Sequence, residues 1–161
     1  MKPKHLSLAF LASALIVLSP LVSSAQYPFP TPTTPDAQRN ALTQVRSQVN
    51  WLQNATRTAV NYGQQGYGNV WERFQIVRGA YGAFKQTLNP RQAADGANSF
   101  AELDGGLDIL QEAFENYQTD LAAGRSAGAA LRDMCQVLRD GSRLWLDELN
   151  KTCSRLRVGW H

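Results

Sequence analysis

The spacing of apolar residues after Pro35 constrains the fold more than any other feature of this sequence. Apolar or small side chains recur there alternately three and four positions apart, in four successive rows. The rows are Leu42, Val45, Val49, Leu52, Thr56 and Ala59; Val70, Phe74, Val77, Tyr81, Phe84 and Leu88; Phe100, Leu103, Leu107, Leu110, Phe114, Tyr117 and Leu121; and Leu131, Cys135, Leu138, Ser142, Trp145, Leu149, Thr152 and Leu156. An average spacing of 3.5 residues keeps each row on one face of an α-helix.

Helices of this kind are unstable alone, because most of their stability comes from burying the apolar face against a neighbour. Four rows that pack against one another make a bundle with shallow crossing angles, and short connections make successive helices antiparallel. The sequence therefore predicts an all-α fold, an antiparallel up-down-up-down four-helix bundle of long helices over residues 36–158. The last residues, 159–161, are expected to fray.

Capping residues and glycines predict where the helices begin and end. Thr34 with Pro35, and Ser126, have the chemistry of helix starts, whereas Asn89 with Pro90 is expected to end the second long helix. A glycine-rich break is expected over 62–68, followed by a cap at Asn69. A short helical turn is expected over 91–98, ended by Gly96, and a capping box from Ser99 to Glu102 begins the third long helix. Gly124 is expected to end that helix.

The N-terminal segment resembles the targeting peptides of exported proteins. Lys2 and Lys4 precede an apolar stretch over 6–18, and small residues end at Ala25. This order predicts a signal peptide over 1–25, with a periplasmic or extracellular mature protein, and the alternative is an uncleaved membrane anchor. Residues 26–35 are rich in proline and predict an extended spacer, or alternatively a ligand for a proline-recognising partner.

Charge gives no support for nucleic-acid binding. The whole chain carries a formal net charge of +3, of which Lys2 and Lys4 supply two charges. A nucleic-acid interface needs basic residues clustered on one face, and none is visible. At most, the cationic end of the chain touches a membrane surface peripherally.

Cys135 and Cys153 fall in one helical row, which argues against a disulfide between them. An unbroken helix holds their Cα atoms about 27 Å apart, whereas a disulfide needs about 7 Å or less. We expect buried free thiols, and the alternatives are a break in the helix that lets the pair close, or a bridge between two chains.

No catalytic or cofactor motif is present. The two histidines are His5 and His161, so the predicted bundle lacks the commonest general base and metal ligand. Haem attachment needs Cys-x-x-Cys-His, which the sequence around Cys153 does not provide. We therefore expect a non-enzymatic protein without a cofactor.

Two charged rows are the remaining candidates for a site. Asp104, Asp108 and Glu112 repeat every four residues and are weak candidates for a carboxylate metal site, although a solvated helix face explains them as well. The second row recurs every seven residues, as flanking charges do when they select a neighbouring helix, and is otherwise a candidate partner-binding stripe. It consists of Arg125, Arg132 and Arg139.

Glycines inside the predicted helices have two explanations. Gly79, Gly82, Gly105 and Gly106 each cost about 1 kcal/mol relative to alanine, which close helix packing or a ligand groove offsets. We favour packing. Taken together, the sequence predicts an exported bundle that binds a protein partner or associates with itself. The alternative is a binder of small molecules or of a metal through carboxylates.

Overall fold

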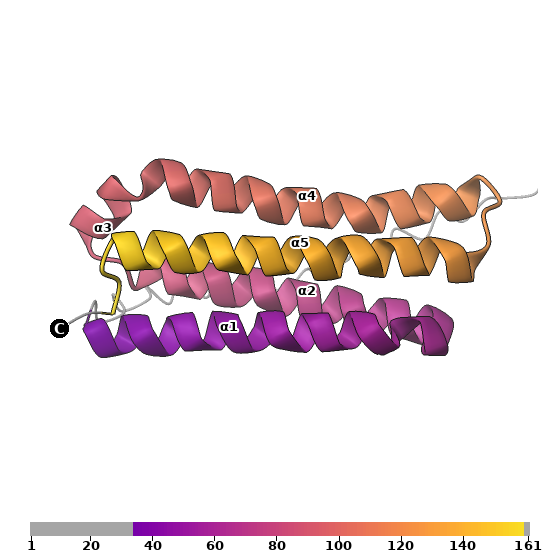
Figure 1. Cartoon of the computed structure of the whole chain (residues 1–161), viewed down its shortest axis with the longest axis horizontal. Helices are drawn as coiled ribbons and strands as arrows, with labels where there is room; N and C mark the ends of the chain where they lie inside the picture. The colour runs from indigo at the N-terminus through magenta and orange to yellow at the C-terminus, as the bar shows by residue number, and fades with distance from the viewer. Residues whose placement is uncertain (1–33, 160–161) are drawn as a thin grey trace, which may run out of the picture.

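A computed structural model describes residues 34–159, and every regular element among them is helical (Figure 1). Four of the helices are long, as the sequence predicts. The elements in order are α1 (Pro35–Thr58), the 3-10 helix η1 (Ala59–Tyr62), α2 (Gly63–Gln86), α3 (Pro90–Asp95), α4 (Ala97–Ala122) and α5 (Ala127–Arg155). The predicted signal peptide and most of the predicted spacer lie outside the described residues.

The long helices lie side by side and alternate in direction (Figure 1). Helix α1 contacts α2 and α5, and α4 contacts α5. Helices α2 and α4 contact each other through aromatic rings and through two ion pairs, Arg78–Asp108 and Lys85–Asp104. Among these rings, Tyr67 stacks on Tyr117 with centroids 4.8 Å apart, and Trp71 meets Phe114 edge-on at 4.8 Å.

The four predicted rows form the core. All of their members are buried except Leu121 and Leu156, which are partly buried. The short connections bring these rows together because each reversal uses only a few residues. The stripe spacing thus predicts the buried faces of all four long helices.

The predicted helix starts at Thr34 and Ser126 are confirmed, and α2 ends at Gln86, shortly before the stop expected at Asn89. The Thr34 hydroxyl accepts a hydrogen bond from the Ala37 amide at 3.1 Å, and the Ser126 hydroxyl accepts one from the Ala129 amide at 3.3 Å. Asn89 also begins α3, which was not expected of it: it forms a complete capping box with Gln92, and Pro90 follows it in the first helical position. Each cap satisfies an amide that the helix itself leaves unpaired.

The reversal between α1 and α2 differs from the expected glycine-rich break. The chain turns through η1 and a single residue of positive φ, Gly63 at 53°, and then resumes as helix at once. Gly66 and Asn69 therefore lie inside α2, and the predicted cap at Asn69 is wrong. Gly66 is required for close approach instead, since a Cβ there would lie 2.0 Å from the Ala59 carbonyl oxygen.

The predicted capping box from Ser99 to Glu102 is also wrong. Helix α4 already begins at Ala97, and the Phe100 amide bonds to the Gly96 carbonyl at 2.9 Å. Because α3 and α4 are joined through Gly96 alone, the Gly96 carbonyl accepts the first of the helical hydrogen bonds of α4. No side-chain cap is needed at that point.

Close packing explains only some of the helical glycines. A Cβ on Gly106 would lie 2.9 Å from Cδ1 of Trp145, so this glycine admits the indole. A Cβ on Gly79, Gly82 or Gly105 would meet nothing within 4 Å, so the packing explanation is wrong at those three positions.

A buried polar network ties the chain end to the start of α1. Gln38 is 3% exposed, and its amide group donates to the Thr87 carbonyl at 3.0 Å and to Gln92. Its side-chain oxygen accepts from the Gly159 amide at 2.9 Å. Gly159 is therefore held in place, contrary to the expectation that fraying begins there, while residues 160–161 lie outside the described part.

Candidate functional site: the groove between α4 and α5

Large apolar side chains that remain exposed are the first indication of a binding surface. They are Trp51, Tyr62, Trp71, Ile109, Val137 and Leu144. Ile109 on α4 and Val137 and Leu144 on α5 border one groove along the outer side of the α4–α5 pair. Their exposed fractions are 62%, 50% and 64%, so three side chains that would gain from burial face solvent together.

The groove consists of two hollows that share Ile109. One hollow, of about 260 Å³, is lined by Leu144 and Trp145, and the other, of about 310 Å³, is lined by Val137 and Met134. Since both hollows border Ile109, they lie end to end along the two helices.

Two glycines form the floor of the first hollow. Gly106 on α4 packs against Trp145, and a Cβ on Gly141 of α5 would lie 2.5 Å from Cδ2 of Leu110. Any larger residue at these two positions would clash with its neighbour and fill the floor. The glycines therefore allow both the close contact of α4 with α5 and the depth of the groove.

Trp145 gives the groove a fixed wall. Its indole N–H donates to the Leu103 carbonyl at 2.8 Å, and its ring meets Tyr81 edge-on at 5.1 Å. A tryptophan held by both a hydrogen bond and a ring contact loses little further entropy when a ligand packs on it. The wall is thus prepared for binding.

Every charged side chain that lines the groove is acidic. Glu102 and Glu148 line the first hollow, and Glu112, Asp120 and Asp133 line the second. Asp120 and Asp133 are bridged by Arg125, whose own pKa is raised by these two hydrogen bonds. Glu148 meets Lys151 at 3.4 Å, so the remaining negative potential centres on Glu102 and Glu112.

The predicted carboxylate row does not converge on one point. Asp104 pairs with Lys85 of α2 at 2.6 Å, and Asp108 pairs with Arg78 of α2 at 3.3 Å. Glu112 instead lines the groove on the α5 side. Within residues 34–159, no group of three or more His, Cys, Asp or Glu side chains is placed to hold a metal ion.

The predicted arginine row is distributed along α5 and the turn before it. Arg125 closes the α4–α5 turn, and Arg139 lies 3.7 Å from its neighbour Asp140. Arg132 is exposed on α5. None of the three lines the α4–α5 groove, so the structure does not bring them together as a stripe on that surface.

Both cysteines are buried free thiols on α5. Burial raises the pKa of Cys135 to about 11 and the pKa of Cys153 to about 12. Because a thiolate is the reactive form, neither residue is prepared for nucleophilic chemistry at neutral pH.

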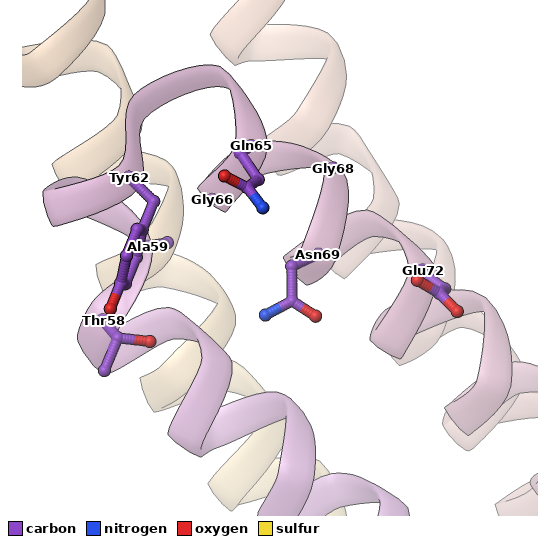
Figure 2. Close-up of a pocket in the computed structure, with 8 residues that line it drawn as sticks. All are labelled: Thr58, Ala59, Tyr62, Gln65, Gly66, Gly68, Asn69 and Glu72. Carbon is purple, nitrogen blue, oxygen red and sulfur yellow. The ribbon is translucent and has the colours of Figure 1, made fainter.

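A larger hollow lies at the α1–α2 reversal (Figure 2). It measures about 600 Å³, and the amide groups of Gln65 and Asn69 face the space beside Tyr62 and Thr58. Its lining pairs no nucleophile with a base, and its single carboxylate is Glu72.

No family model, curated protein or solved structure matches this chain. Within residues 34–159, no helix combines the length and the apolar character needed to cross a membrane.

Sequence reasoning missed the three exposed apolar residues. Val137 and Leu144 recur seven positions apart on α5, beside the core row and outside it. A second apolar row that flanks the first is the signal that points to them. With Ile109, they show that the α4–α5 pair has an apolar outer face in addition to its buried one.

Proposed function

We propose that this chain is an exported, non-enzymatic interaction module that binds a partner helix along the α4–α5 groove. The observation that carries the proposal is the row of exposed Ile109, Val137 and Leu144 over a floor opened by two glycines. A helix laid in a groove contributes one apolar residue per turn, which is the spacing that such a row accepts. Export remains a prediction from the sequence, on which the binding argument does not depend.

The charge of the groove selects the kind of partner. Glu102 and Glu112, the lining carboxylates that no cation among the described residues pairs with, favour an amphipathic helix whose apolar face is flanked by Lys or Arg. Two copies of this chain packed groove to groove would place carboxylates against carboxylates, which disfavours self-association through this surface. From Glu102 to Asp120 the groove runs about 27 Å along α4, which corresponds to a partner helix of about five turns.

The alternative functions gain no specific support. Two members of the candidate metal row, Asp104 and Asp108, are already engaged by cations on α2. Among residues 34–159 there is no histidine to serve as base or ligand, and both thiols are buried. Binding through the apolar groove is the activity that the geometry supports best.

The test uses a defined peptide and the mature full chain. An amphipathic helical peptide of leucine and lysine, about 18 residues long to match the groove, is titrated into the protein by calorimetry at two salt concentrations. A peptide with every lysine replaced by glutamate, and a scrambled leucine–lysine peptide, serve as ligand controls. Leu144→Ser and Ile109→Ser remove apolar contacts without changing charge, and Trp51→Ser on α1 is the matched control.

The proposal predicts that the basic amphipathic peptide binds and that its two control peptides bind at least tenfold more weakly, a factor worth ~1.4 kcal/mol. Each groove variant should weaken binding by about tenfold, as expected for a central apolar contact, while Trp51→Ser leaves it unchanged. Equal binding of all three peptides, or equal loss in Trp51→Ser, would contradict the proposal. If the protein instead forms a dimer that dissociates in Leu144→Ser, the occupant of the groove is a second copy of the chain and not a partner helix.

A further inference from the structure

A cleft with basic lining lies between α3 and the turn that ends α5, in contrast to the acidic groove between α4 and α5. It measures about 580 Å³, and three arginines line it: Arg91, Arg155 and Arg157. Asp95 is the one carboxylate in the lining and pairs with Arg91 at 3.5 Å. The cleft therefore has a formal excess of two positive charges.

The backbone at Arg157 is strained. Arg157 has φ of 51° and is the one non-glycine residue of positive φ among those described. It follows α5 in a Schellman turn, in which the Val158 amide bonds to the Cys153 carbonyl at 2.9 Å and the Arg157 amide bonds to Ser154 at 3.2 Å. Glycine is favoured at this position because the Cβ of any other residue crowds the backbone at positive φ.

An arginine that occupies a glycine position at the edge of an arginine-lined cleft calls for a reason other than stability. Strained backbone is retained where the side chain has a function, and an observed outlier is a legitimate starting point for such a hypothesis. The same turn places Arg155 and Arg157 on the cleft together. The strain and the charge excess thus point to the same small region.

The cleft is held in shape by its neighbours. Gln92 completes the capping box of α3 and joins the buried network of Gln38. Arg155 donates to the Ser99 hydroxyl at the start of α4. The Gln92 side-chain amide also donates to the Leu156 carbonyl at 3.5 Å, which joins the two walls directly, so a ligand would not have to bring them together on binding.

We propose that this cleft binds a phosphoryl group. Arginine presents several donors in a planar fork that fits the oxygens of a phosphate, and a phosphomonoester carries about −1.5 to −2 charges at neutral pH. That charge matches the excess of the cleft. The phosphoryl group belongs either to a soluble phosphate compound or to a lipid headgroup, and the inference does not depend on the α4–α5 groove.

Inorganic phosphate and vesicles test the two sources separately. Phosphate is titrated into the mature protein at constant ionic strength, with binding followed by calorimetry and by the shift in melting temperature. Flotation with phosphatidylcholine vesicles, with and without phosphatidic acid, tests the headgroup. The variants are Arg155→Gln and Arg157→Gly, and Arg57→Gln is the control because it removes the same charge from the last turn of α1.

Arg157→Gly gives a result that a purely structural role does not predict. Without ligand it should raise the melting temperature by about 2 to 6 °C, because glycine relieves the strain at positive φ. It should nevertheless weaken phosphate binding by about tenfold, as should Arg155→Gln, while Arg57→Gln changes it less than twofold. A stabilised variant that binds worse cannot be explained by damage to the fold.

Binding in either arm that depends on Arg155 and Arg157 supports the proposal and identifies the source. Retention on phosphatidic acid vesicles that both variants abolish assigns the headgroup, and phosphate binding without retention assigns a soluble compound. The proposal would be overturned if neither phosphate nor phosphatidic acid vesicles bind, or if Arg57→Gln weakens binding as much as Arg155→Gln and Arg157→Gly do. Failure here would leave the peptide experiment on the α4–α5 groove unaffected.

Discussion

Alanine at Gly66 and alanine at Gly68 should have opposite effects on stability. Both glycines lie in the first turns of α2, two positions apart. A Cβ at Gly66 would lie 2.0 Å from the Ala59 carbonyl oxygen and 2.7 Å from the Ala59 Cα, whereas a Cβ at Gly68 would meet nothing within 4 Å. Comparison of the two variants therefore separates the cost of a close backbone contact from the ordinary gain in helix propensity.

The expected magnitudes follow from these distances. Because the obstacle at Gly66 is backbone, the α1–α2 reversal must move by about 1 Å, and we expect a loss of roughly 3 kcal/mol, the upper range for overpacking. Gly68→Ala should instead gain about 1 kcal/mol, since alanine is the better helix former. The two variants should thus differ by about 4 kcal/mol, a large part of the stability of a domain of this size.

Urea unfolding of the full mature chain, followed by circular dichroism at the helical band, measures both free energies. The slope of the transition should stay constant, so that midpoints report stability alone. A difference between the variants below ~1 kcal/mol would show that α1 and α2 do not approach each other as described. A stabilised Gly66→Ala would refute the geometry of the reversal outright.

Two further predictions concern the α4–α5 pair and its thiols. Gly106→Ala should destabilise the protein by about 1 to 2 kcal/mol, because the new Cβ would lie 2.9 Å from Trp145. Gly105→Ala should stabilise it by about 1 kcal/mol, because a Cβ there meets nothing within 4 Å and alanine is the better helix former. Urea unfolding of both variants measures these changes, and equal effects would contradict the packing at the groove floor. The thiols of Cys135 and Cys153 have a folded pKa raised by burial from 9.0 to about 11 and about 12, so the unfolded state releases their protons first and stability should fall as the pH rises from about 9 to about 12. Replacing both cysteines with alanine should make that part of the stability profile shallower, with a remaining fall because burial also raises the pKa of Tyr81; an unchanged slope would show that burial does not govern the titration of the thiols.

The helices could be predicted from the sequence because their signals are local. A row at three-and-four spacing identifies the buried face whatever the partner is, and the caps at Thr34 and Ser126 depend on residues within one turn. The same locality caused the errors. The letters of a capping box occur at Ser99 within a helix, and among several glycines near Gly63 only the structure shows which one takes positive φ.

The candidate site could not be predicted because exposure depends on which helices are neighbours. Val137 and Leu144 are visible as a second apolar row, but whether α4 or α1 would cover them is a tertiary question. The role of Gly141 depends on Leu110, a residue far away in sequence. In the same way, Arg157 is an ordinary charged residue in the sequence, and only its backbone conformation in the structure distinguishes it.

Amide chemical-shift mapping with the leucine–lysine peptide tests the central claim, that the α4–α5 groove is the docking surface, most directly. On titration, the account predicts that the largest shifts follow Gly106, Ile109, Val137, Gly141 and Leu144, while amides on the outer faces of α1 and α2 stay in place. Largest shifts around Trp51 and Tyr62, or shifts spread evenly over all four long helices, would contradict it.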